Sequence, residues 1–182
     1  MTRVERYLTD SDFSVLKDMK GRRLHYMRLD CDPSDIALQV IEFGFGEKKY
    51  YLYCDLEVLE YFGYPEDISY FEFTPVKYPF VDHKDLVFDL VGKDISGISE
   101  VRDTIKVYMD GELDHVYSFT YGVIVSFGEY QIAFEKFAEF SELIQVRRGY
   151  DLISKFSPVE RYRDDFIAGT QLELSRDIVE IC

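Results

Sequence analysis

The sequence predicts an α+β fold: an antiparallel β-sheet of hairpins and a meander, with three or four short helices packed against it. Apolar and polar residues alternate on both sides of several glycine-containing turns, the pattern of strands with one buried face. Elsewhere, capping residues precede segments whose apolar residues recur at helical spacing. The 182 residues are 47% hydrophobic, enough for a single domain with its own core. Residues 92–98 are the linker if the chain instead forms two lobes.

The most regular part of the chain is a meander of four predicted strands, at residues 104–109, 112–119, 121–127 and 130–134. Asp110-Gly111 marks the first turn. A two-residue loop would place Val107 opposite Asp114 and mix apolar and charged residues on one face. A three-residue loop that starts at Met109 places Val107 opposite Leu113 and keeps that face apolar. We therefore expect the three-residue loop.

The N-terminal half contains three more predicted strands, at residues 23–29, 36–45 and 50–55. Residues 85–91 form another short apolar run, whereas the three prolines between residues 64 and 79 allow at most one short edge strand. A Phe-Gly-Glu turn follows both residues 36–44 and residues 121–126, and each time a strand and an acidic, aromatic segment come next. This recurrence leaves open whether 36–62 and 121–140 are a duplicated hairpin-plus-helix unit.

Helices are predicted at residues 10–20, 135–148 and 158–168. The first follows a cluster of capping side chains that begins at Thr9, and the second has acidic residues early and arginines late, as the helix dipole favours. The third begins at Ser157-Pro158, with Glu160 as the capping-box residue. Residues 172–181 fit either a helix or a strand, and a second capping box at Thr170 favours the helix.

Charge is the strongest signal in the composition. Asp and Glu number 35 against 21 Lys and Arg, which gives a formal net charge of −14 and a pI near 4.6. Such a surface repels nucleic acids and anionic membranes and attracts basic partners. Acidity that serves only solubility is an equally weighted alternative.

Cysteine usage and hydropathy favour a reducing cytoplasm. Three cysteines without paired spacing (Cys31, Cys54 and Cys182) argue against a disulfide framework. The first residues contain no apolar run typical of a signal peptide, and no stretch approaches 18 apolar residues. The chain has no Asn, which excludes N-linked glycosylation and a Cys-His-Asn triad.

Motifs for catalysis or for metal binding are absent from the sequence. The three histidines (His25, His83 and His115) form no HExxH pair, and no CxxC is present. His83 lies in the charged tetrapeptide that spans residues 82–85, which is more often a solvated loop than an acid/base cluster. His115 is expected opposite Ile105, partly buried in the sheet. We expect no enzyme activity, no metal and no cofactor.

The function that fits these features is a non-enzymatic acidic binding protein. We expect an inhibitor, of the immunity-protein or anti-CRISPR type, that docks on the basic surface of a nuclease or a nucleic-acid-guided effector and contacts no nucleic acid itself. The expected partner-binding residues form two acidic, tyrosine-containing clusters: Glu57, Glu60, Tyr61, Tyr64, Glu66 and Asp67, and Tyr108, Asp110, Glu112 and Asp114. The alternative is a small-ligand-binding protein or enzyme with a pocket in the aromatic region 61–80.

Overall fold

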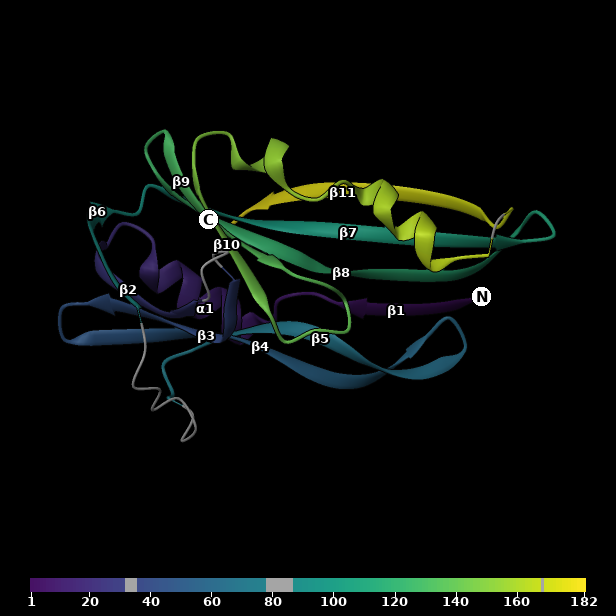
Figure 1. The fold of residues 1–182 in the computed structure, drawn as a ribbon, viewed down its shortest axis with the longest axis horizontal. Helices are drawn as coiled ribbons and strands as arrows, with labels where there is room; N and C mark the ends of the chain where they lie inside the picture. Colours follow the sequence, from purple (N-terminus) through teal and green to yellow (C-terminus); the bar gives the residue numbers. More distant parts are fainter. Residues whose placement is uncertain (32–35, 78–86, 168) are drawn as a thin grey trace.

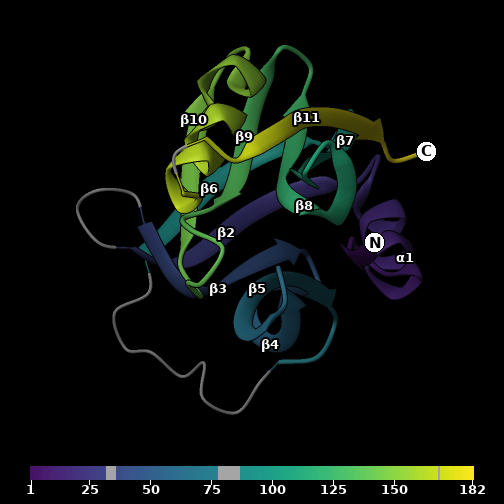
Figure 2. The same cartoon turned by 90° about the vertical axis from the view of Figure 1, so that its right-hand side faces the viewer.

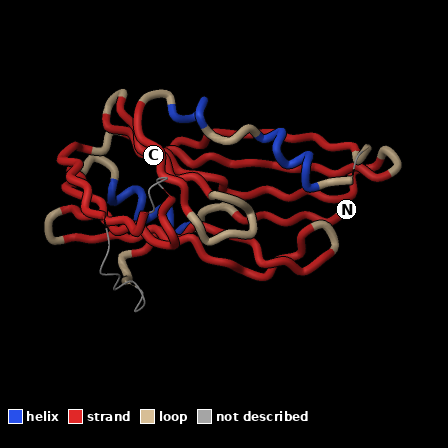
Figure 3. The backbone as a smooth tube through the Cα atoms, viewed as in Figure 1, coloured by secondary structure: helices blue, strands red, loops and turns tan. Residues whose placement is uncertain are grey.

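The computed structural model describes residues 1–31, 36–77, 87–167 and 169–182, and for residues 30–31, 36–38 and 87–88 the backbone only. Eleven strands in this part of the chain join in one sheet, accompanied by one α-helix and two short 3-10 helices (Figures 1 and 3). The strands are β1 (Thr2–Arg6), β2 (Arg23–Cys31), β3 (Ile36–Phe45), β4 (Lys48–Tyr61), β5 (Tyr64–Thr74), β6 (Val87–Asp94), β7 (Gly97–Met109), β8 (Glu112–Phe127), β9 (Tyr130–Lys136), β10 (Ile144–Gly149) and β11 (Gln171–Glu180). The helices are α1 (Asp10–Met19), η1 (Leu152–Lys155) and η2 (Val159–Asp165).

The sheet branches at two long strands. Along one edge, β8 pairs with β7; along the other it pairs first with β1, in parallel, and then with β9. Similarly, β3 pairs with β2 on one side and with both β10 and β4 on the other. The β4–β5 hairpin therefore separates from the rest of the sheet and projects below β7, β8 and β1, as Figure 1 and the end-on view of Figure 2 show.

The predicted fold class is wrong, because strands dominate the described chain and only one helix is α-helical. The helix predicted at 10–20 is confirmed as α1. Its N-cap residue Thr9 and Asp12 form a reciprocal capping box, and a carboxylate oxygen of Asp12 also accepts a hydrogen bond from the Phe73 N–H of β5 at 2.6 Å.

The helix predicted at 135–148 does not form; this segment contains the end of β9, a loop and β10. The early acid and late arginine that indicated a helix dipole are in fact an ion pair between adjacent strands, with Arg147 Nε 2.8 Å from the buried carboxylate of Glu135. Phe137 and Phe140, in the loop between β9 and β10, are about half exposed. A cross-strand pair thus imitated a helical charge pattern.

The C-terminal helices also differ from the prediction. The segment predicted at 158–168 is helical only over η2, a seven-residue 3-10 helix whose N-cap, Pro158, makes no side-chain cap. Residues 172–181 form a strand, since all ten residues of β11 pair with β7. The local sequence fitted both a helix and a strand and slightly favoured the helix. The strand forms because β7, more than 60 residues away, supplies the ladder hydrogen bonds.

The strand predictions are confirmed in position; the one at 36–45 has the bounds of β3, and most of the others are too short. The strands predicted at 112–119 and 121–127 are one continuous strand, β8, and the segment from 64, expected to hold one short strand, forms the eleven-residue β5. Pro65 does not disrupt β5. The Ser69 N–H bonds Glu139 O on the side away from β4, so position 65, four residues earlier, also faces away and needs no ladder donor.

The β7–β8 turn has two residues, not three. Asp110 and Gly111 both have left-handed backbone angles (φ 51° and 84°), as a type I′ turn requires. A bulge at Asp114 then places Val107 opposite His115, so the apolar face is kept by an extra residue in the strand and not by a longer loop.

Two apolar cores share the sheet. The larger lies under α1 and includes Leu16, Met27, Phe43 and Phe134. The smaller lies between β7, β8 and the 3-10 helices, and the tip of the β4–β5 hairpin packs against its outer end. That outer end is where the candidate site is found.

Candidate functional site

Two hairpin tips that are distant in sequence meet at one end of the molecule. The β4–β5 turn at Phe62-Gly63 and the β7–β8 turn at Asp110-Gly111 both point to the right-hand end of Figure 1, away from α1. A cleft of about 570 Å³ lies between them, and the last residue of η2 with the two that follow it, residues 165–167, closes a third side. Such a volume suits a small ligand or one or two side chains of a partner.

Aromatic rings form most of the cleft wall. Tyr61 packs edge-on against Phe62 (ring centroids 4.4 Å apart) and against Phe140 (5.3 Å). Phe62 in turn packs edge-on against Phe166 (4.9 Å). Tyr64 adds a ring that is 71% exposed at the mouth. The rings of Tyr61, Phe62, Phe140 and Phe166 are held by one another, so their faces and edges are fixed before any ligand arrives.

Phe62 has a strained backbone. Its φ of 49° is left-handed, a conformation that is rare for a bulky side chain and is usually filled by Asn, Asp or Gly in a type I′ turn. The ring gains contacts with His115 of β8 (5.8 Å between centroids) and with Phe166. Strain of this kind is found at ligand clamps and active sites, where the surrounding structure compensates for it.

The charged groups of the cleft are all acidic apart from one histidine. Carboxylates of Glu66, Asp114 and Asp165 line it, and no Lys or Arg is among the lining residues. His115 Nδ1 lies 2.8 Å from the Asp114 carboxylate. Burial, reinforced by repulsion from the nearby Glu139 carboxylate, raises the pKa of Asp165. An acid in that condition favours the approach of a cation.

The Tyr61 hydroxyl is an unused polar group at the base of the cleft. It is buried and has no hydrogen-bond partner in the described part of the chain. Burial is the main reason that the pKa of Tyr61 is raised, so the hydroxyl keeps its proton. An unsatisfied buried hydroxyl loses stability that a partner group could restore.

The structure brings four of the ten predicted partner-binding residues together: Tyr61, Tyr64, Glu66 and Asp114 line the cleft. Two more lie at its edge. Asp110 is in the exposed β7–β8 turn, and Glu112 pairs across that turn with Met109, which lines the cleft.

The other four predicted residues do not line the cleft. Glu60 and Asp67 lie on the opposite face of the β4–β5 hairpin, because successive strand residues point to opposite sides. Glu57 binds Arg6 of β1 at 2.8 Å, and the Tyr108 hydroxyl donates to Glu173 of β11. The local sequence could not distinguish these four residues from the six that line the cleft or lie at its edge.

Sequence reasoning missed the third wall of the cleft. Phe140 lies in the segment predicted as the helix at 135–148, which does not form, and Phe166 and Ile167 lie in the part of the predicted helix at 158–168 that follows the end of η2. No local sequence signal marked these residues, because their place in the wall depends on how segments distant in sequence pack together.

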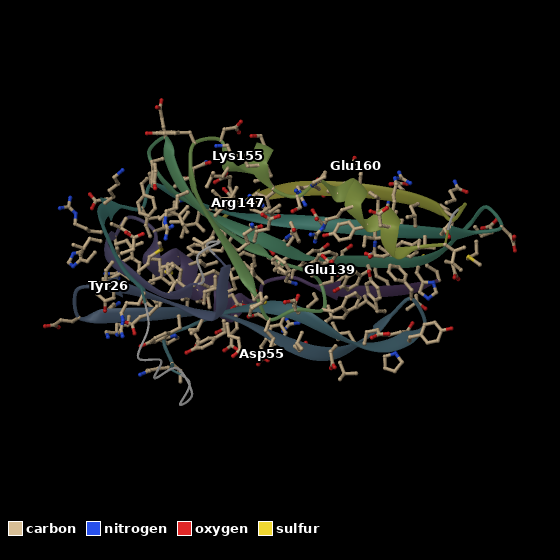
Figure 4. All side chains as sticks on the ribbon, in the orientation of Figure 1. Tyr26, Asp55, Glu139, Arg147, Lys155 and Glu160 are labelled. Atoms are coloured by element: carbon tan, nitrogen blue, oxygen red, sulfur yellow. The ribbon has the colours of Figure 1, made fainter. Side chains whose placement is uncertain are left out.

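A second group of polar side chains lies at the smaller core, and most of its polar atoms are paired with one another. Asp103, completely buried, accepts two hydrogen bonds from the Arg176 guanidinium (2.6 and 2.7 Å) and one from the Tyr162 hydroxyl (2.9 Å). Arg161 of η2 binds the Glu139 carboxylate at 2.7 Å. These contacts fasten η2 to the sheet, and Figure 4 labels Glu139 among them. We interpret this group as structural.

Glu135 extends the same network toward β10. Its carboxylate accepts from the Tyr121 hydroxyl (2.7 Å), from Arg147 (2.8 Å; labelled in Figure 4) and from the Ser157 N–H (2.8 Å). These donors outweigh the effect of burial and lower the pKa of Glu135. A carboxylate held ionised by three donors is a poor general acid or base at neutral pH.

Lys136, next in sequence, is a buried amine to which no carboxylate of the described residues is bound. Its ammonium donates to the Ser69 carbonyl and lies over the rings of Phe119 (5.3 Å) and Phe71 (5.9 Å). Burial lowers the pKa of Lys136 to about 8. It is not among the residues that line the cleft, so we assign it no catalytic role.

The remaining candidate residues offer no assembled chemistry. His25 is exposed on β2, His83 and the rest of 82–85 lie outside the described residues, and burial raises the pKa of the Cys54 thiol to about 12. Among the residues that the structure describes, no three His, Cys, Asp or Glu side chains gather as metal ligands. No helix of the described chain has the length and apolar character to cross a membrane.

Searches against protein-family models, curated proteins and solved structures find no match to this chain, so the cleft itself is the basis for a function.

Proposed function

We propose that the protein is a non-enzymatic binding protein that docks on a basic protein partner with the end formed by the two hairpin tips. One observation carries the proposal: acidic and tyrosine residues from hairpins about 50 residues apart line a single cleft. Aromatic residues at the centre of an interface contribute most of its binding energy, and charges at the rim speed association. The cleft and its rim have that arrangement.

Nucleic-acid-binding proteins are the partner class that fits best. Their channels carry Lys and Arg that normally hold phosphates, and a surface with net charge −14 competes for those side chains. In this proposal the partner is a nuclease or a nucleic-acid-guided effector, and docking blocks its access to nucleic acid. The protein is then an inhibitor that acts by occupation and needs no catalytic residue.

A second candidate is a small-ligand-binding protein or enzyme that uses the same cleft. The cleft includes residues of the aromatic 61–66 segment, and its His115–Asp114 pair is a potential acid/base pair. Turnover or saturable binding of an uncharged metabolite, without capture of a protein, would favour this second candidate.

A capture experiment with matched charge reversals tests the proposal. Wild-type protein and the variant Asp110→Lys/Glu112→Lys are used to capture proteins from nuclease-treated cell lysates at low salt, and the captured proteins are identified by mass spectrometry. The control is Glu47→Lys/Glu129→Lys, which reverses two exposed hairpin-turn acids at the opposite end of the molecule with the same change in net charge.

We expect wild type and control to capture the same basic, nucleic-acid-binding protein and the tip variant to lose it. With the purified partner, the tip variant should associate at least tenfold more slowly at low salt, and the difference should shrink as salt rises because ions screen the field. Equal capture by both variants, or no basic protein captured by wild type, would contradict the proposal.

A further inference from the structure

The protein repeatedly uses one arrangement to hold its own arginines: an aromatic ring below the guanidinium and a carboxylate beside it. Arg6 lies 4.2 Å from the ring centroid of Tyr70 and binds Glu57. Arg102 lies 4.3 Å from the ring centroid of Tyr7 and binds Glu100. In both, the flat cation stacks on the ring while its N–H groups bind an oxygen, as guanidinium chemistry allows.

The buried network contains the same arrangement twice more. Arg161 lies 4.5 Å from the centroid of Tyr121 and binds Glu139. Arg176 lies 4.9 Å from the same ring on Tyr121 and binds Asp103. Four arginines on different elements are therefore each held by a ring and a carboxylate.

The cleft has these rings and carboxylates but no arginine. Its walls carry five aromatic side chains and three carboxylates, with no Lys or Arg among the lining residues. Glu66 and Asp165 make no ion pair with any residue in the described ranges, unlike the four carboxylates above. The Tyr61 hydroxyl has no hydrogen-bond partner in the described ranges but is buried, so an N–H donor reaches it only if the neighbouring rings move.

We propose that the cleft is an arginine pocket, which receives the guanidinium of an arginine side chain from the docked partner. The inference rests on the proposed function for the source of that arginine. The guanidinium lies against the ring of Tyr61 or Tyr64, with Glu66 or Asp165 beside it. Arginine is favoured over lysine because its planar, weakly hydrated cation stacks on rings and binds a carboxylate with two parallel N–H groups.

Binding of small probes tests the pocket without the partner. N-acetyl-arginine amide, N-acetyl-lysine amide and N-acetyl-citrulline amide are titrated into the full chain, and aromatic resonances are followed by NMR. Citrulline has the shape of arginine without its charge. We expect saturable shifts at Tyr61, Phe62 and Tyr64 with the arginine probe, with a Kd on the order of 1 mM. Lysine should bind at least threefold more weakly and citrulline at least tenfold.

Paired variants establish that the carboxylates are responsible. Glu66→Gln/Asp165→Asn should weaken binding of the arginine probe at least tenfold, whereas Glu47→Gln/Glu129→Gln, which removes the same charge at the opposite end, should leave it unchanged. Both pairs are exposed, so the fold is expected to persist, and the amide spectrum of each variant checks that it does.

Several outcomes would overturn the inference. Equal binding of citrulline would mean an apolar pocket, and equal or tighter binding of lysine or of tetramethylammonium would mean a pocket for an ammonium. Absence of saturable shifts up to about 50 mM probe, fifty times the expected Kd, would mean no pocket for an isolated cation. If the arginine probe binds but the tip variant captures the same proteins as wild type, the proposed function fails and the pocket stands. If capture depends on the tips and the arginine probe does not bind, the pocket fails and the proposed function stands.

Discussion

The buried network around Asp103 and the open cleft at the hairpin tips both combine aromatic rings with carboxylates. They differ in whether arginines of the chain pair with those carboxylates. In the network, Asp103 and Glu139 each bind an arginine of the chain itself. In the cleft, Glu66 and Asp165 bind no arginine among the residues that the structure describes. A carboxylate paired inside the protein stabilises the position of a segment, whereas one left unpaired beside rings is available to a partner. The two regions should therefore respond in opposite ways to the loss of charge.

The largest effect is expected where a paired charge is broken. Arg176→Met leaves Asp103 fully buried without its cation and should lower the free energy of unfolding by about 3–5 kcal/mol. Urea unfolding followed by circular dichroism measures the change. The double variant Asp103→Leu/Arg176→Met should recover much of the loss, since an apolar pair replaces an ionic one. A loss below about 1 kcal/mol for Arg176→Met would mean that the network does not hold η2 in place.

Lys136 provides the intermediate case, a buried cation to which no carboxylate in the described part of the chain is bound. Burial lowers its pKa to about 8, while the unfolded chain holds the proton up to its ordinary pKa near 10.5. Between these values the unfolded state binds more protons, so stability should rise with pH from about 8 to 10.

Lys136→Met removes the buried ammonium and should raise the free energy of unfolding at pH 7 by about 2–3 kcal/mol. The rise in stability between pH 8 and 9.5 should disappear in this variant. Measurements stop at pH 9.5 because tyrosines of the unfolded chain begin to ionise near pH 10. A pH slope that persists in the variant would assign the titration to another group.

The sequence predicted an element correctly where the contacts that stabilise it lie within a few residues along the chain. It failed where those contacts come from a distant strand. The start of the helix after Thr9 and the position of the turn at Asp110-Gly111, though not its loop length, were predicted because their signals lie within a few residues. The strand at Gln171–Glu180 was missed because its partner, β7, lies more than 60 residues away. The ion pair of Glu135 and Arg147 was mistaken for a helix dipole for the same reason.

The candidate site shows the same limit. Residues of both hairpins were chosen for acidity and tyrosine content, and the meeting of the two tips then separated Tyr61 and Glu66 from Glu60 and Asp67. That separation depends on which alternate residues of β4 and β5 face the cleft, and on the two hairpin tips lying at the same end of the molecule. Phe166 could not be assigned at all, because its place in the wall depends on how η2 packs on the sheet.

A smaller effect should separate the two roles of Phe62, strained backbone and cleft ring. Phe62→Ala removes the ring and keeps an unfavourable left-handed residue, whereas Phe62→Asn removes the ring and places a residue that tolerates this conformation. The Asn variant should therefore be more stable than the Ala variant by about 1 kcal/mol, measured by urea unfolding. Equal stability of the two variants would mean that the turn relaxes and that φ at this position is not constrained.

The smallest change in stability is expected at Asp165. We expect a gain when this carboxylate is neutralised, whereas breaking the ion pair of Asp103 causes a loss. Burial and the Glu139 carboxylate raise the pKa of Asp165, so at neutral pH its ionised form is less favourable in the folded state than in the unfolded state. Asp165→Asn should therefore increase the free energy of unfolding at pH 7, by no more than about 0.5 kcal/mol because the side chain is largely exposed. As pH falls through the range just above 3.8, Asp165 takes up its proton in the folded protein first, and the gap between wild type and variant should close. Urea unfolding at pH 7 and pH 4 measures both values, with Asp177→Asn, an exposed acid on β11, as the control. A stability loss at pH 7 would place Asp165 with Asp103 among the paired, structural carboxylates and remove it from the arginine pocket.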